Sequence, residues 1–222
     1  MIIDNNPSIE EKVYAILEEE ILTGALPSGT VLRESALAAR FEASRTPVRA
    51  ALTRLADNGL IELMSNKGAT VIGVTPEDIE DIYAMRMRLE GLAARLAATR
   101  MGEDDKRELS ELLDLYEYYI GRRDCDKRSE LDSQFHRIIF EASGSRYLSK
   151  ILTDLHRRIK AYRRHSLSSH DRAEMALVEH KGILKAIEMG DGDEAERLTE
   201  IHLNAALDSI KKQINGEYAN KG

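Results

Sequence analysis

The stretch Ser44-Arg45-Thr46-Pro47-Val48-Arg49-Ala50-Ala51-Leu52 decides how the first part of this chain is interpreted. Its apolar residues follow the spacing i, i+3, i+4 and i+7 that one face of a helix requires, namely Val48, Ala51, Leu52 and Leu55. Because a stripe of this kind is normally buried, the sequence predicts a helix with its back in a core and its polar face outward.

The start of this helix has the features of a DNA reader. Ser44 is a suitable N-cap, and Pro47 lies in the first turn, where no intrahelical N–H bond is lost. Arg45 and Arg49 are one turn apart on a face that excludes the apolar stripe. Arginines placed there can bond guanine in the major groove, while free N–H groups and hydroxyls hold phosphate. Taken alone, the helix fits an ordinary charged surface helix equally well.

The residues after this helix predict a small β-hairpin. Asn58-Gly59 ends the helix, and short strands are expected at 60–64 and 69–73. The turn between them is Ser65-Asn66-Lys67-Gly68, which places Lys67 at the tip, within reach of a DNA backbone beside the groove. A hairpin that follows a DNA-reading helix is the wing of a winged helix.

Upstream, the pattern is a helix, an extended piece and a second helix. Ser8-Ile9-Glu10-Glu11 has capping-box spacing and begins a helix that Gly24 stops. Turn residues and a short extended piece lead to Leu32, and residues 35–41 form the second helix. The sequence therefore predicts a winged helix-turn-helix DNA-binding domain over residues 1–74.

A boundary follows at Thr75-Pro76-Glu77-Asp78, which offers an N-cap, a proline at the first helical position and acids in the first turn. Beyond it the periodicity is helical only, with helices expected at 76–99, 104–121, 124–142, 146–167, 171–189 and 193–214. Short breaks favour antiparallel neighbours. The fold class is mainly α: the winged domain, then an antiparallel all-α bundle of about six helices over residues 75–222.

Composition limits the classes of function. The 222 residues carry a net charge of −7, so a global basic signature for nucleic acid is absent. From Arg33 to Lys67, however, the chain has six cationic and four anionic residues. The local net charge of +2 indicates that DNA affinity is confined to one face of the protein. Cys125 has no partner for a disulfide. Because no apolar run approaches about 18 residues and no signal peptide opens the chain, we expect a cytoplasmic protein that does not bind membranes.

The bundle contains a candidate metal site. Asp132 and His136 are i, i+4 and project from one face of a helix, while His180 and His202 lie on the apolar faces of the last two helices. Three histidines and one aspartate suit zinc, nickel, manganese or iron and leave coordination positions open. The alternative is a set of core histidines that satisfy each other or backbone carbonyls.

The sequence resembles the GntR-type transcriptional regulators and, in its second domain, the FadR-like branch with an FCD effector domain. In the first domain the resemblance is carried by residues 37–38, 44–52, 59–61 and 66–69. In the second it is carried by 86–90, Asp132 with Phe135-His136, Glu179-His180, 186–187, 190–191 and His202-Leu203. Six bundle helices rather than seven would place the chain nearer the VanR-like subgroup.

This resemblance implies a homodimer that binds double-stranded operator DNA. The candidate DNA contacts are Arg33, Ser44, Arg45, Thr46, Arg49, Lys67 and Gly68. It also implies one divalent metal ion per subunit, held by Asp132, His136, His180 and His202, beside a small carboxylate effector. The candidates for binding that effector are Arg86, Arg88, Arg163 and Arg164, each of which also fits a solvated helix charge.

Two other classes of function compete with this interpretation. A metal-dependent helical-bundle enzyme with an accessory DNA-binding domain could use such a metal to activate water, but no convincing general base accompanies the site. A di-iron bundle would need two Glu-x-x-His motifs, which the sequence lacks. An architectural DNA binder without a ligand conflicts with the acidic charge and the interior histidines. The sequence therefore favours a ligand-responsive transcriptional regulator and not an enzyme.

Overall fold

The computed structural model describes residues 7–64 and 68–219, with side chains as far as Ile214. The chain divides into two compact units, Met1–Thr75 and Pro76–Gly222. This division lies beside the boundary expected at residue 74. Each unit buries apolar residues of its own, so each has a separate core.

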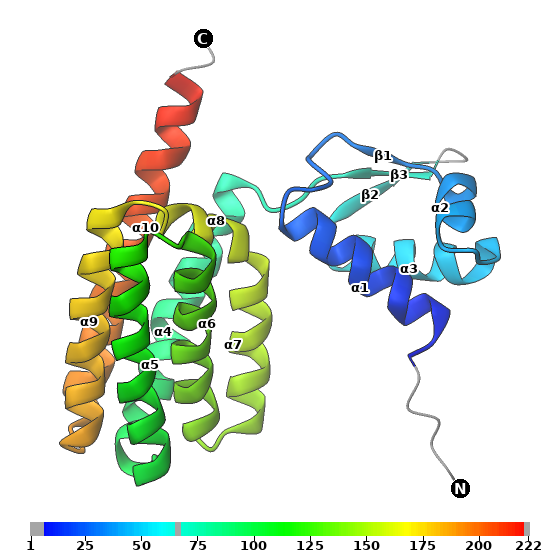
Figure 1. The fold of residues 1–222 in the computed structure, drawn as a ribbon. Coiled ribbons are helices and arrows are strands. Elements are labelled where there is room, and N and C mark those ends of the chain that lie inside the picture. Colours follow the sequence, from blue (N-terminus) through cyan, green and yellow to red (C-terminus); the bar gives the residue numbers. More distant parts are fainter. Residues whose placement is uncertain (1–6, 65–67, 220–222) are drawn as a thin grey trace, which may run out of the picture. The chain divides into compact units, whose positions relative to one another are not determined.

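The first unit is a winged helix-turn-helix, drawn from blue to cyan in Figure 1. Its elements are α1 (Ile9–Leu22), β1 (Val31–Leu32), α2 (Glu34–Arg40), α3 (Arg45–Asp57), β2 (Ile61–Met64) and β3 (Gly68–Val71). The expected capping box opens α1, because the Ser8 hydroxyl accepts from the Glu11 N–H and the Glu11 carboxylate accepts from the Ser8 N–H. The predicted succession of helices and strands is confirmed.

The wing is a three-stranded antiparallel sheet in the order β1-β3-β2. The short extended piece before α2 is strand β1, which pairs Val31 with Thr70. Gly68 has φ +97°, and a Cβ there would lie 2.0 Å from the carbonyl oxygen of Leu32, so glycine is required where β3 approaches β1. Residues 65–67, where the hairpin turn with Lys67 at its tip is predicted, lie outside the described residues.

Helix α3 packs against the core of the first unit through the predicted stripe. Val48, Ala51, Leu52 and Leu55 are all buried. They belong to one apolar cluster with α1, to which Leu17 contributes a fully buried side chain. Burial of each leucine stabilises the unit by about 1.5–3 kcal/mol. This packing fixes the orientation of α3 and leaves Arg45 and Arg49 on the exposed face.

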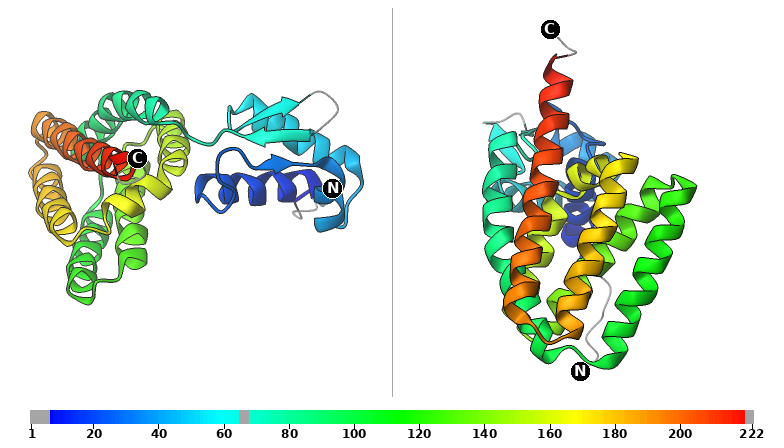
Figure 2. Two further views of the ribbon diagram at one scale, coloured as in Figure 1. Left: turned by 90° about the horizontal axis from the view of Figure 1, so that it is seen from above. Right: turned by 90° about the vertical axis from the view of Figure 1, so that its left-hand side faces the viewer.

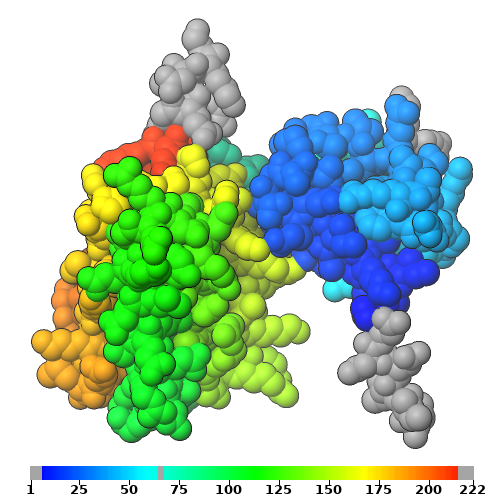
Figure 3. Space-filling view, viewed as in Figure 1, coloured from blue at the N-terminus to red at the C-terminus, as the bar shows by residue number. Residues whose placement is uncertain are grey.

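In the second unit, all described secondary structure is helical: α4 (Pro76–Arg100), α5 (Glu103–Arg122), α6 (Cys125–Ala142), α7 (Arg146–Arg158), α8 (Lys160–Ser166), α9 (His170–Glu188) and α10 (Gly192–Ala219). Six of these form a ring in which α4, α10, α9, α5, α6 and α7 each contact the next and α7 contacts α4. Figure 2 shows this ring from above. In the space-filling view, side chains of α5 and its neighbours close the spaces between the ribbons (Figure 3).

The helix predicted at 146–167 is interrupted. Ile159 has φ −106° and ψ 12°, outside helical values, and it separates α7 from α8. Its side chain is fully buried, so the bend is held by the core. The described part of this unit therefore contains seven helical segments rather than six, and the helix count does not support placement in the VanR-like subgroup. The bend turns α8 so that Arg163 reaches Asp132 on α6.

Candidate metal centre and DNA-binding surface

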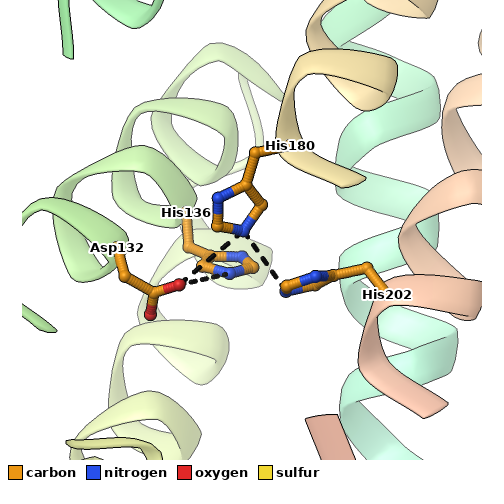
Figure 4. Close-up of side chains that lie close together, drawn as sticks. All are labelled: Asp132, His136, His180 and His202. Carbon is orange, nitrogen blue, oxygen red and sulfur yellow. Dashed lines mark hydrogen bonds and ion pairs between the residues drawn. The ribbon is translucent and has the colours of Figure 1, made fainter. Parts of the chain in front are cut away.

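The four predicted metal ligands meet in the interior of the ring. Asp132 and His136 come from α6, His180 from α9 and His202 from α10, as Figure 4 shows. One donor atom of each lies within 4.8 Å of the others, and we call this group the four-ligand cluster. The Nε2 atoms of His180 and His202 are 3.3 Å apart. Two nitrogens that bind one zinc ion tetrahedrally at about 2.1 Å would be separated by about the same distance.

Asp132 is ionised in this setting. Burial alone would raise its pKa, but the neighbouring Arg163 guanidinium acts in the opposite direction, and the pKa is lowered overall. Arg163 donates to Oδ2 of Asp132. Oδ1 faces the histidines, 3.9 Å from Nε2 of His136 and 3.7 Å from Nε2 of His180. One carboxylate oxygen is thus held by an arginine while the other is directed at the ring nitrogens.

Two carboxylates orient the imidazoles from behind. Nδ1 of His202 lies 2.6 Å from a carboxylate oxygen of Glu179, and Nδ1 of His136 lies 2.9 Å from one of Glu90. A carboxylate at Nδ1 favours the tautomer with hydrogen on Nδ1 and the lone pair on Nε2. Since the Nε2 atoms face the cluster, both rings present a lone pair where a metal ion would be bound.

Burial keeps two of the histidines neutral. It lowers the pKa of His180 and of His202 well below the ordinary value, and the repulsion from neighbouring histidines acts in the same direction. Neutral imidazole nitrogens and one ionised carboxylate are suitable ligands for a divalent first-row metal. By donor chemistry, spacing and tautomer control, the residues present fit the metal that the sequence predicts.

The four predicted effector-binding arginines separate into two pairs. Arg86 and Arg163 are buried and lie against the four-ligand cluster. Arg88 is instead largely exposed and pairs with Glu200, and the exposed Arg164 pairs with Asp126. The structure therefore brings Arg86 and Arg163 to the site and leaves Arg88 and Arg164 on the surface of the bundle.

A small cavity of about 20 Å³ adjoins the cluster, and we call it the bundle cavity. Its lining includes Asp132, His136, His202, Arg86, Arg163 and Arg172. Nη1 of Arg86 and both Nε and Nη1 of Arg172 are buried without a hydrogen-bond partner in the part of the chain described by the structure. Buried guanidinium donors without acceptors are unfavourable, so the cavity is suited to an anion.

Sequence reasoning missed four residues of this site: Glu90, His156, Arg172 and Glu179. Glu90 accepts from Arg86 and lies 2.9 Å from Nε2 of His156, whose Nδ1 accepts from Arg163. Burial lowers the pKa of His156 well below its ordinary value, so this ring is neutral. One available signal was the i, i+4 spacing of Arg86 and Glu90. A second signal was the i, i+7 spacing of Arg172 and Glu179, which places both on one face of α9. The partners of His156 depend on packing between helices, which no local pattern encodes.

The predicted DNA contacts gather at one open groove of about 990 Å³ in the first unit, which we call the α3 groove. Arg33, Arg45, Arg49 and Gly68 line it. Ser44 stands at the N-cap position of α3, but its side chain makes no capping hydrogen bond, and Thr46 is exposed beside it. Arg45 and Arg49 lie in the first two turns of α3, whose first N–H groups lack intrahelical partners, and Arg33 is the N-cap residue of α2. Together the three arginines form a surface suited to phosphate and base edges.

Arg49 already has a partner in the structure. Its Nε and Nη2 donate to the two carboxylate oxygens of Glu34 on α2, at 2.9 and 2.8 Å. The hydrogen bonds raise the pKa of Arg49 and lower that of Glu34. Glu34 also lines the α3 groove and was not predicted from the sequence.

Comparison with protein families matches both units. Residues 9–71 match the family of bacterial regulatory proteins named gntR, and residues 81–205 match the FCD domain. The second match covers more than half of the chain and contains the four-ligand cluster. Among the described residues, none of the helices combines the length and hydropathy needed to cross a bilayer.

Relatives similar over most of the chain are transcriptional regulators. The HTH-type transcriptional repressor RspR of Escherichia coli is 29% identical over 217 residues, 96% of this chain and 95% of the relative. The gluconate operon transcriptional repressor of Bacillus licheniformis is 30% identical over 187 residues, 82% of this chain and 76% of the relative. The structure of E. coli McbR/YncC has the same fold, with a TM-score of 0.76, 22% identity and coverage of 94% of this chain and 100% of that one.

Proposed function

We propose that this chain, which belongs to the GntR family of bacterial regulatory proteins and carries an FCD domain, changes its binding to operator DNA when a small organic acid enters the second unit. Its relatives are transcriptional regulators rather than enzymes. The observation that carries the proposal is the bundle cavity, where unpartnered donors of Arg86 and Arg172 lie beside the four-ligand cluster.

The proposed site combines a metal ion with cationic side chains. A divalent ion at Asp132, His136, His180 and His202 would supply an open coordination position that attracts a carboxylate. The chain itself supplies buried guanidinium groups, whose charge-assisted hydrogen bonds to a carboxylate are about twice as strong as neutral ones. A neutral ligand could accept from these donors but would not offset the charge of the guanidinium groups, so the site favours acids.

The small size of the cavity indicates which part of the bundle must move when an acid binds. A volume of about 20 Å³ holds about one water molecule, so an organic acid can enter only if lining side chains move. Three lining residues, Arg163, Ser166 and Leu167, belong to the short helix α8 or follow it directly. Displacement of α8 is therefore the change that we assign to acid binding.

For the first unit we propose direct contact with operator DNA through the α3 groove. Arg45 carries no ion pair in the described residues and is the first residue of α3, so it is the strongest candidate for a bidentate contact to guanine. In the proposed homodimer, two such surfaces bind half-sites that are about one helical turn apart.

Fluorescence anisotropy with the chain's own promoter region tests the proposal. We expect binding that weakens steeply with salt and changes when acetate, gluconate or citrate is added to metal-loaded protein. Arg45→Ala should weaken specific binding by about 1–3 kcal/mol. Arg107→Ala, which removes an exposed arginine of the second unit, serves as the control. Absence of salt-dependent binding to this DNA, with and without the acids, would overturn the proposal.

A further inference from the structure

The arginines of the bundle cavity are not equivalent. Nη1 of Arg163 donates to His156 at 2.8 Å and its Nη2 to Asp132, so this side chain is engaged by the protein. Arg172, on α9, donates only through Nη2, to Glu179 at 2.9 Å. Its Nε and Nη1 are buried and lack an acceptor in the described residues. Arg163 therefore holds the site together, whereas Arg172 has donors to spare.

Arg172 is also connected to the four-ligand cluster. The oxygen of Glu179 that accepts from Arg172 is Oε2, and the same atom lies 2.6 Å from Nδ1 of His202. One carboxylate oxygen is thus shared between a residue of the bundle cavity and a residue of the four-ligand cluster. Any anion that draws the Arg172 guanidinium toward itself weakens one of the two hydrogen bonds to that oxygen and strengthens the other.

Arg128 provides an internal comparison. It is as buried as Arg172 and has an unpartnered Nε as well, but it belongs to α6 and does not line the bundle cavity. Its Nη2 donates to the carbonyl oxygen of Ser168. Burial of an incompletely paired arginine is therefore shared by both residues, and access to the cavity distinguishes them.

We propose that Arg172 binds the acid directly in the bundle cavity and that Glu179, acting as a positioning residue, couples the bound acid to the metal ligand His202. The inference rests on the proposed function, because it assigns these roles within the acid-binding metal site. It predicts that acid and metal strengthen each other's binding through the Arg172–Glu179–His202 connection, in addition to any direct coordination.

Calorimetric titration of full-length, nickel-loaded protein with acetate and with gluconate tests the role of Arg172. We expect Arg172→Gln to weaken the binding of the acid by at least tenfold while nickel stays bound, because a charge-assisted hydrogen bond in a buried site is lost. Arg128→Gln should bind the acid within about twofold of the wild type. Equal acid binding by Arg172→Gln and the wild type would overturn the inference.

A conservative variant guards against loss of folding. Arg172→Lys keeps the charge but loses the planar donor fork, so acid binding should fall between that of the wild type and that of Arg172→Gln. If Arg172→Lys binds the acid as tightly as the wild type, the planar guanidinium donors are not required for acid binding. If nickel-loaded wild-type protein binds neither acetate nor gluconate, the proposed function fails together with the inference. If the wild type binds and the Arg172 variants bind equally well, the inference alone fails.

Competition with a chelator tests Glu179. We expect Glu179→Gln to weaken nickel binding by about 10-fold or more, the range found when a residue that orients a metal ligand is replaced. Saturating acetate should tighten nickel binding in the wild type by a larger factor than in Glu179→Gln. Glu200→Gln, which removes an acid on the same bundle that pairs with Arg88 at the surface, is the control. An identical acetate effect in wild type and Glu179→Gln would overturn the coupling role.

Discussion

The two units use the same ion pair in opposite surroundings. In the first unit, Arg49 and Glu34 join through two hydrogen bonds, with side chains 69% and 25% exposed. In the second, Arg86 and Glu90 are also joined, but each side chain is only 1% exposed. The residue types are identical, so the difference in role comes from the environment.

Exposure makes the first pair exchangeable. Water can replace either partner of Arg49–Glu34, and a phosphate can take the place of the carboxylate at little cost. The buried pair has no such substitute, because each charge would be left in a medium that solvates it poorly. The exposed Arg49 of the first unit can thus change partners, whereas Arg86 and Glu90 in the bundle stay joined.

Removal of one buried partner should have the largest effect. Glu90→Ala leaves the Arg86 charge uncompensated and should destabilise the second unit by about 3–5 kcal/mol. Urea unfolding of metal-free protein, followed by far-ultraviolet circular dichroism, measures this change. Glu34→Ala is the matched control and should hardly shift the unfolding midpoint. Equal shifts for the two variants would contradict the comparison.

The second prediction concerns the metal, which should bind only to the buried set. His180→Ala should abolish tight binding of nickel or zinc, whereas His170→Ala, at an exposed position that pairs with Glu174, should leave it intact. A free metal concentration of about 100 times the dissociation constant should stabilise the wild type by about 2.7 kcal/mol. Thermal unfolding with and without a chelator measures both effects. Metal stabilisation that persists in His180→Ala would show that the ion binds elsewhere.

The third prediction separates the units by pH, because all six histidines belong to the second unit. Burial lowers the pKa of His156, His180 and His202 in the folded chain. As the pH is lowered, these histidines therefore become protonated in the unfolded chain before they do so in the folded chain. The free energy of unfolding should be highest above about pH 6.5 and fall as the pH drops below it. We expect a loss of up to about 1.4 kcal/mol per pH unit for each histidine in metal-free protein. Urea titrations between pH 7.5 and 5 measure it, and a flat profile would contradict neutral buried histidines.

Local sequence patterns predicted more of the fold of the first unit than of the candidate metal and acid site in the second unit. The stripe from Val48 to Leu55 and the turn glycines encode the winged fold locally, and the four-ligand cluster was found from spacing together with the family resemblance. Arg88 and Arg164 were expected at the site but lie outside it, because the sequence does not show which face of a charged helix turns inward. The bend at Ile159 could not be predicted from the sequence, because no glycine or proline stands there and the bend depends on the packing of the buried side chain.

The smallest expected effect comes from weakening the exposed pair without removing its hydrogen-bonding group. Glu34→Gln keeps an acceptor for Arg49 but removes an anion from the α3 groove. The matched control is Glu20→Gln, which in the same way removes the charge but keeps an acceptor in the Arg40–Glu20 pair, in the same unit but outside the groove. Stability should change little in both variants.

The two variants should differ in DNA binding. Glu34→Gln makes Arg49 available as one more phosphate contact, which would steepen the plot of log affinity against log salt concentration by about 0.9 for non-specific DNA. Specific binding should gain less, because Glu34 no longer fixes the guanidinium toward one base edge. The ratio of specific to non-specific affinity therefore falls. Anisotropy titrations at several salt concentrations measure both slopes, and an unchanged slope in Glu34→Gln would mean that Arg49 makes the same phosphate contacts in the wild type as in the variant.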